Sequence, residues 1–143
     1  MSLFPLLSAP ERLPAGTGRL PLFREAAWNF QTNRPIWRGG EPVYVTGASA
    51  VLVWAWNALH TEKGLHDVLT RDYGLGIRAL EGQPYTDAVR QSEAVRYVRE
   101  CLETNPYIQS VDHIRASLER SRLLLSCRIN TVYGEVTLDG CQL

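Results

Sequence analysis

The sequence contains no hydrophobic run long enough to cross a lipid bilayer. Its longest apolar run extends from Ala48 to Leu59, well short of the about 20 residues that a membrane-spanning helix needs. The first residues are apolar, but Pro5 and Pro10 interrupt them, and they lack the basic start and long apolar stretch of a signal peptide. We therefore expect a soluble protein that is made in the cytoplasm and has no membrane partner.

The chain also lacks a surplus of either charge. It has 15 Lys and Arg residues against 15 Asp and Glu residues, so its formal net charge is zero. Proteins that bind nucleic acids usually carry a basic surplus or a basic stripe, and the sequence shows neither. We expect no nucleic-acid partner.

Cysteine is scarce, and the residues that build metal and catalytic sites are scattered. Cys101, Cys127 and Cys141 are an odd number without a C-x-x-C pair, which favours reduced thiols over disulfides. The histidines do not cluster with other metal ligands, and the sequence has no nucleophile-elbow, P-loop or zinc-protease motif. We expect no cofactor, no metal ion and no enzyme activity.

Two alternatives to this reading stay open. Glycoside hydrolases use two carboxylates, and Glu62, Asp67 and Asp72 lie in a glycine-containing segment after an aromatic-rich stretch. Each of these carboxylates has a cation nearby, as ordinary surface ion pairs do. A peptidoglycan-directed, lysozyme-like glycoside hydrolase is one alternative, and a generic protein-binding module is the other.

The distribution of proline divides the chain into two parts. Residues 1–21 contain four prolines and two glycines, which predicts an extended N-terminal segment. The remaining length suits one compact domain, which we place at residues 22–143.

The pattern of this domain predicts an α+β fold. Residues 22–45 have short β-rich stretches separated by turn signals, which predicts an N-terminal β-hairpin or small meander. A first helix is expected from about Thr46 to His60, with Thr46 or Ser49 as its cap, and a second from Thr86 to Thr104. Alternating apolar residues after position 107 predict a C-terminal antiparallel unit of three strands.

The first expected helix is apolar on nearly all sides. A helix without a polar face must be covered on more than one side, so it is either the central core helix or partly covered by another chain. Together with apolar residues of the N-terminal segment, its tryptophans are our candidates for cover by a partner: Phe4, Leu6, Trp54 and Trp56.

Several short motifs occur in an order that resembles a known family. They are Trp28-Asn29-Phe30, Glu41 to Gly47, Leu59-His60-Thr61-Glu62, Arg71 to Leu75, Glu93 to Val98, Asn105 to Val111, and Asn130 to Val136. In this order they resemble the small baseplate wedge or sheath-initiator protein of contractile phage tails, as in PBSX-type prophages. That family is related to the "lysozyme-like" baseplate wedge protein of T-even phages and to counterparts in type VI secretion and contractile bacteriocins.

The resemblance implies a structural part of a virion tail baseplate, synthesised in the cytoplasm of a bacterial host. Family members join the wedge to the tail tube in a hexameric arrangement, and they initiate the sheath by accepting its strands onto their own β unit. The implied partners are the tail sheath protein, the baseplate wedge proteins and the tail tube or hub proteins.

The resemblance also implies two interaction regions. For the sheath, the candidate residues of strand augmentation are Leu124, Ser126, Arg128, Asn130 and Tyr133. For the wedge, the candidate loop residues are Thr61, Glu62, Lys63, Tyr73 and Gly74. The acid–arginine signature with which T-even relatives grip the wedge is missing from this loop, which puts the individual wedge contacts in doubt. For the sheath, an ordinary three-stranded sheet whose outer strands merely face water is the alternative.

Overall fold

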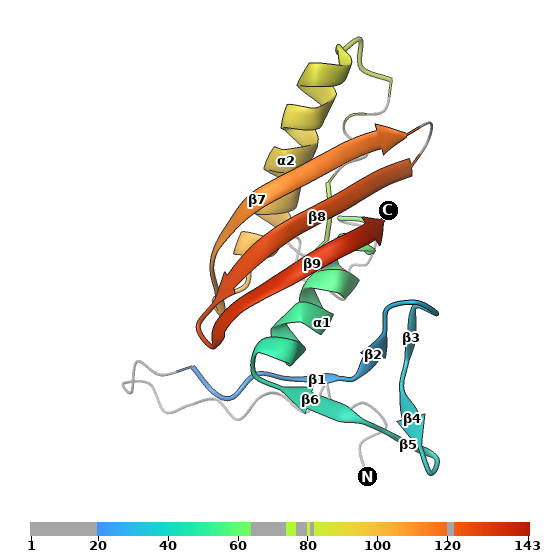
Figure 1. Cartoon of the computed structure of the whole chain (residues 1–143), viewed down its shortest axis with the longest axis vertical. Helices are drawn as coiled ribbons and strands as arrows, with labels where there is room; N and C mark the ends of the chain where they lie inside the picture. The colour runs from blue at the N-terminus through green and yellow to red at the C-terminus, as the bar shows by residue number, and fades with distance from the viewer. Residues whose placement is uncertain (1–19, 64–73, 77–79, 81, 120–121) are drawn as a thin grey trace.

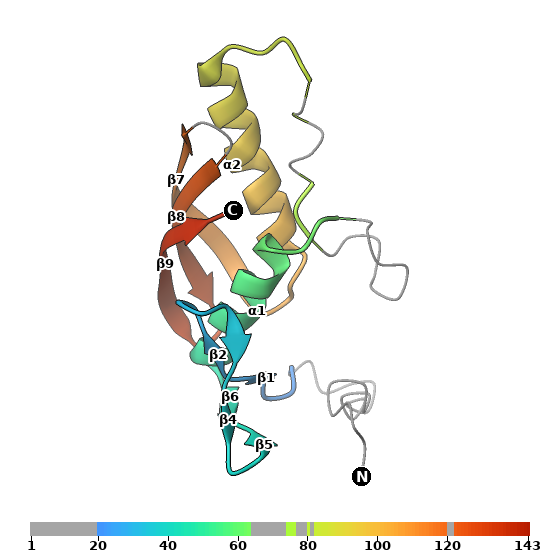
Figure 2. The same cartoon turned by 90° about the vertical axis from the view of Figure 1, so that its right-hand side faces the viewer.

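The structure is a computed structural model, and it describes residues 20–63, 74–76, 80, 82–119 and 122–143. Two helices lie on one face of a three-stranded antiparallel sheet, and short paired strands form a separate region below them (Figures 1 and 2). The prediction of an α+β fold with two main helices and a C-terminal three-stranded unit is therefore confirmed. The predicted N-terminal segment lies almost wholly outside the described residues, and so do Phe4, Leu6, Asp67, Asp72 and Tyr73.

The C-terminal sheet consists of β7 (Ile108–Glu119), β8 (Arg122–Thr131) and β9 (Gly134–Gln142), in that spatial order. Burial alternates strictly along most of β8: every second residue is buried, and the residues between are exposed or half-buried. Successive side chains of a strand point to opposite faces, so β8 turns one apolar face towards the helices. The buried residues of this face are Leu123, Leu125, Cys127, Ile129 and Thr131.

The helices α1 (Ala48–Leu59) and α2 (Asp87–Glu103) cover the inner face of the sheet. Thr86 caps α2 by accepting a hydrogen bond from the Val89 N–H at 3.3 Å, so the predicted range from Thr86 to Thr104 corresponds to the helix with its two cap residues. At the start of α1 the prediction was wrong, because the cap residue is Gly47 and no side chain caps the helix. Gly47 has a φ of 68°, and its N–H donates to the Phe23 carbonyl at 3.0 Å.

The core lies between the helices and the sheet. Its largest completely buried side chains come from all of these elements: Val51, Val98, Leu102, Leu125, Ile129 and Cys141. Burial also raises the pKa of the three free thiols, to about 12 for Cys101, about 11 for Cys127 and about 12 for Cys141. They therefore pack as small apolar side chains at neutral pH.

Trp56 belongs to this core, which corrects the expectation that a partner covers it. Its side chain is only 8% exposed and packs on Phe30 and His60, with ring centroids 4.9 and 4.5 Å away. The indole N–H donates to the Asn33 side-chain oxygen at 2.8 Å, which satisfies its polar group inside the protein. Trp54 is half-buried and packs against the same core.

Three short antiparallel pairs form the N-terminal region. They are β1 (Arg24–Ala26) with β6 (Tyr44–Thr46), β2 (Trp28–Asn29) with β3 (Arg34–Pro35), and β4 (Trp37–Arg38) with β5 (Glu41–Pro42). They point in three directions from a common centre (Figure 1). The predicted hairpin or meander is thus a branched one.

Main-chain hydrogen bonds close the centre of this region into a ring. Ala27 N–H donates to the Val43 carbonyl at 2.7 Å, Val43 N–H to the Ile36 carbonyl at 3.0 Å, and Ile36 N–H to the Ala27 carbonyl at 2.9 Å. We call these three residues the three-way junction. Each residue donates once and accepts once, so the junction satisfies its own main-chain groups where the three pairs separate.

Glu25, in the middle of β1, makes stability depend on pH. Burial raises the pKa of its carboxyl group from 4.5 to about 7, so the folded protein favours the neutral form. Relative to the ionised form, the neutral Glu25 carboxyl group favours the folded state. This stabilisation is fully present below the pKa of the unfolded chain and is lost as the pH rises through the folded-state pKa of about 7. We expect Glu25→Gln to raise the melting temperature clearly at pH 8 and much less at pH 5. Equal shifts at both pH values in thermal unfolding would contradict this origin.

Candidate interaction surface

The outer face of the C-terminal sheet, turned away from the helices, carries a polar network around Arg128. Its guanidinium Nε donates to Asp112 Oδ1 at 2.7 Å, a terminal nitrogen lies 3.6 Å from Glu135, and another contacts the His113 ring. The hydrogen bonds from Arg128 and then from Asn130 lower the pKa of Asp112, which keeps it ionised. The network therefore joins the outward side chains of all three strands.

The position of β8 corrects one expectation. The candidate residues Leu124, Ser126, Arg128 and Asn130 all lie on β8, which pairs with β7 on one side and β9 on the other. Their main chain is already in the ladder, so they cannot form the open edge that strand augmentation requires. Within the described part of the chain, the open edges belong to β7 and β9.

Both edge strands are irregular: the pairing of β7 with β8 shifts register twice, first between Ile108 and Ser110, and that of β9 with β8 shifts once. In β7 the register shifts again between Asp112 and Arg115, where His113 has a left-handed φ of 51°. In β9 it shifts opposite the segment from Leu125 to Cys127, near Gly140, whose φ is 62°. Such bulges bend a strand and break its regular pairing, so the regular part of the β9 edge extends from Gly134 to Leu138.

A shallow hollow of about 170 Å³ lies beside the β9 irregularity. Leu124, which is 39% exposed, and Ser126 contribute to its lining. Across β8 the hollow is bounded by Arg115 of β7 and by Asp139 of β9. The hollow thus combines an apolar surface with one cation and one anion, next to the strand edge.

Tyr133, the fifth sheath candidate, lies in the turn between β8 and β9 and already has a structural task. Its hydroxyl oxygen accepts a hydrogen bond from the Phe23 N–H at 3.0 Å, and its ring stacks on Tyr107. The Tyr107 hydroxyl donates to the Pro21 carbonyl at 2.5 Å. Two tyrosines therefore attach the start of the described chain to the turn end of the sheet.

The candidate wedge loop begins directly after α1. Leu75 N–H donates to the Thr61 carbonyl at 2.8 Å, and Lys63 N–H donates to the Leu75 carbonyl at 3.2 Å, so the two ends of the loop are joined. Gly74 lies buried at this junction. The structure thus brings Thr61, Glu62, Lys63 and Gly74 together, as the sequence predicts for one loop.

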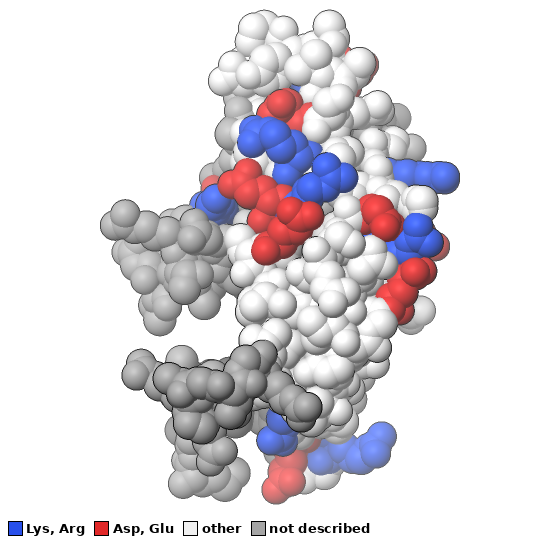
Figure 3. All heavy atoms as spheres, turned by 90° about the vertical axis from the view of Figure 1, so that its left-hand side faces the viewer, with Lys and Arg blue, Asp and Glu red and all other residues white. Residues whose placement is uncertain are grey.

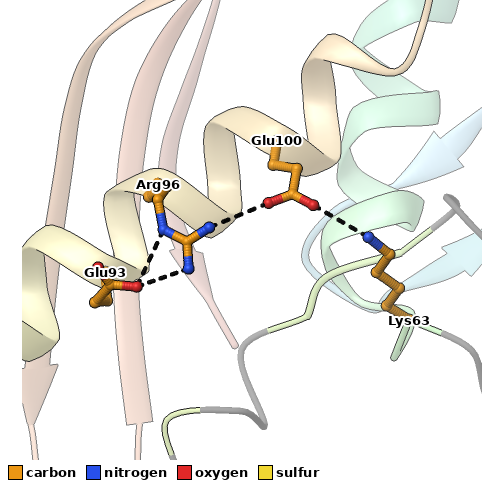
Figure 4. A network of polar contacts seen from close by, with 4 residues as sticks. All are labelled: Lys63, Glu93, Arg96 and Glu100. Atoms are coloured by element: carbon orange, nitrogen blue, oxygen red, sulfur yellow. Dashed lines mark hydrogen bonds and ion pairs between the residues drawn. The ribbon is translucent and has the colours of Figure 1, made fainter.

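Lys63 also connects this loop to α2. Its ammonium group lies 3.2 Å from Glu100, which in turn lies 3.5 Å from Arg96, and Arg96 donates to Glu93 at 2.7 Å (Figure 4). Each of these side chains is at least one-third exposed, so the pairs contribute little to stability singly. Their effect is to orient the loop relative to the helix.

The charged side chains do not form a surface of one sign. Figure 3 shows Lys and Arg interleaved with Asp and Glu on the side that it presents. Among the described residues, no group of His, Cys, Asp and Glu is arranged to hold a metal ion. No described helix is both long and apolar enough to cross a membrane.

Asp112 and Glu135, the two carboxylates that face Arg128, were not predicted as interaction residues from the sequence. The signal that could have identified them is the short connection between consecutive strands: it predicts that β7, β8 and β9 pair in sequence order and that outward polar residues face each other. The glycosidase alternative rests on Glu62, Asp67 and Asp72, of which only Glu62 is described.

A family model described as contractile injection system sheath initiator matches residues 24–134, which include α1, α2, β7 and β8. No curated protein matches the chain.

Proposed function

Because the chain belongs to the family of contractile injection system sheath initiators, we propose that it starts the sheath by accepting a sheath strand on an open edge of its C-terminal sheet. Its role is structural, in the assembly of the sheath of a contractile tail. The observation that carries the finer proposal is the three-stranded sheet with two open edges in the described chain. An added strand gains main-chain hydrogen bonds along such an edge.

We place the added strand at β9. Its regular edge from Gly134 to Leu138 is uninterrupted, whereas His113 breaks the β7 edge near its middle. Edge-strand recognition takes its specificity from sites for alternate side chains, and the hollow beside Gly140 offers one next to β9. The exposed Glu135 and Asp139 discourage unspecific pairing at the same edge.

The five sheath candidates then divide into two groups. Leu124 and Ser126 line the hollow and are proposed to contact an apolar side chain of the sheath. Arg128 and Asn130 hold Asp112, and Arg128 also holds Glu135, so we propose that they set the charge pattern that the sheath meets. Tyr133 is proposed to shape the turn at which the edge begins.

The remaining assembly partners are proposals from family membership. We propose that the chain belongs to the baseplate of a PBSX-type tail and is synthesised in the bacterial cytoplasm. In the hexameric baseplate, its loop of Thr61, Glu62, Lys63, Tyr73 and Gly74 would contact a wedge protein, and other surfaces the tube or hub. Cover of Phe4, Leu6 and Trp54 by neighbouring chains belongs to the same proposal.

We also propose that the protein is not an enzyme. The matched family is one of sheath initiators, and the enzymatic candidate from the sequence depends on three carboxylates of one glycine-containing segment. Purified protein is expected to leave peptidoglycan intact. Hydrolysis that disappears in Glu62→Ala would overturn this statement.

Co-expression with the sheath protein of the same gene cluster tests the initiator role. We expect the two proteins to co-elute in size exclusion and sheath rings or tubes to begin at this protein in negative-stain micrographs. A folded monomer that does not bind the sheath protein would contradict strand addition at the sheet edge and leave only binding to the wedge as a role.

A further inference from the structure

Trp37, in the β4–β5 hairpin, is the most exposed of the four tryptophans. The Trp37 side chain is 61% exposed, and the neighbouring Ile36 is 38% exposed. The hairpin points away from the C-terminal sheet, at the end of the molecule farthest from the start of α2 (Figures 1 and 2). Exposing a large aromatic side chain to water is unfavourable, and tryptophan is enriched among the residues that contribute most of the binding free energy at protein interfaces.

Several contacts hold this hairpin in one orientation. The three-way junction fixes its base through the hydrogen bonds of Ile36 and Val43. Gly39 and Gly40, with φ values of 60° and 80°, form its tight turn. The two-residue ladder from Trp37–Pro42 to Arg38–Glu41 joins the base to the turn.

The branch beside it is attached to the core. Asn33 accepts hydrogen bonds on one side-chain oxygen from the Trp28 indole at 3.0 Å and from the Trp56 indole at 2.8 Å. Since Trp56 is a buried residue of α1, this contact connects the branched region to the main helix. Trp37 is therefore presented on a supported scaffold, and a partner would not have to order it first.

The charges around Trp37 indicate the chemistry of its partner. Arg34 and Arg38 lie on either side of it in the chain, and both are exposed. Neither makes an ion pair or hydrogen bond to another described residue through its guanidinium group. The hairpin has one exposed acid, Glu41 opposite Arg38, against the two exposed arginines near Trp37 in the chain. This excess of positive charge around an exposed aromatic residue fits an apolar slot that has carboxylates at its rim.

We propose that the β4–β5 hairpin is a second docking surface, separate from the sheath edge. Its partner is a baseplate protein other than the sheath, with an apolar slot for Trp37 and acidic residues that meet Arg34 and Arg38. This rests on the proposed function in one respect, namely that the protein works inside an assembled tail. The hairpin and the β9 edge belong to different sheets, so the two docking surfaces do not share strands and one chain can present both.

Site-specific photo-cross-linking in assembled particles tests the proposal. Benzoylphenylalanine is placed at Trp37 in the full-length protein, and particles are produced from the complete gene cluster. We expect cross-links to one baseplate protein at peptides that contain Asp or Glu. The control position is Thr32, which is exposed in the neighbouring β2–β3 turn and is expected to cross-link much less. No cross-link, or cross-links to the sheath or to a second copy, would overturn the proposal.

Two variants separate this surface from the sheath edge. Trp37→Ala and Arg38→Glu are expected to reduce the amount of the protein in purified particles by at least roughly ten-fold. Both should keep the wild-type melting temperature and still start sheath tubes when co-expressed with the sheath alone. Normal incorporation of both variants would refute the docking surface, whereas loss of sheath tubes for wild type and variants alike would refute the initiator role.

Discussion

Proline in the middle of β9 is expected to leave the domain folded and to abolish sheath assembly. Neighbouring residues of an edge strand point their N–H groups alternately into the sheet and out of it. We therefore consider the adjacent variants Val136→Pro and Thr137→Pro. One of them leaves the hydrogen bonds between β9 and β8 intact and removes a main-chain N–H that points out of the sheet, towards the position of an added strand. The variant that keeps its melting temperature should give no sheath tubes in co-expression, because an added strand loses a main-chain hydrogen bond and meets the proline ring.

The matched control lies on the opposite edge. In β7, Ala116 is half-buried like Val136, and Ser117 is exposed like Thr137. The tolerated member of Ala116→Pro and Ser117→Pro should assemble sheath normally. If the β7 variant blocks assembly and the β9 variant does not, the proposed edge is the wrong one; if neither blocks it, strand augmentation itself is excluded.

Gly74→Ala is expected to destabilise the protein by roughly 3 kcal/mol, which for a chain of this size lowers the melting temperature by about 10 °C. Gly74 has a φ of 105°, which side chains rarely adopt. A Cβ atom there would lie 2.8 Å from the Thr61 carbonyl oxygen and 2.9 Å from the Lys63 nitrogen. Both are main-chain atoms of the pairing that joins the ends of the wedge loop, so neither yields without breaking that pairing.

Gly82 provides the control for this substitution. It also has a positive φ, 74°, but no atom lies within 4 Å of the position that its Cβ would take. Gly82→Ala should therefore cost only the backbone strain, about 1 kcal/mol. Similar losses for both variants in chemical denaturation would show that the contact with Thr61 and Lys63 is not what Gly74 provides.

Elements governed by local patterns were predictable from the sequence. The limits of α2 follow from the cap at Thr86 and the proline after Asn105, and the inner face of β8 follows from alternation. Alternation identifies the face of a strand but not its neighbours. The candidate residues on β8 were accordingly placed on the outward face of the strand, but not on an open edge, because β8 is paired on both sides. The short connections on both sides of β8 already favoured this central position.

Contacts between distant residues were not predictable in this way. Trp56 was a candidate for cover by a partner because α1 has no polar side, yet Asn33, 23 positions earlier, satisfies its indole N–H. The ring of hydrogen bonds between Ala27, Ile36 and Val43 likewise depends on three segments meeting at one point. Neither hydrophobic periodicity nor turn propensity predicts contacts between residues that are far apart in the sequence.

The order of the strands along the chain has a consequence for timing. β9 follows every other described element, and its edge exists only after it has paired with β8. A ribosome delivers residues one after another, and folding of earlier parts precedes the later ones. A nascent chain that has already formed α1 and α2 still has no β9 edge to offer. With the sheath strand added at β9, as proposed above, sheath assembly therefore waits until the last described strand has been synthesised and has paired with β8.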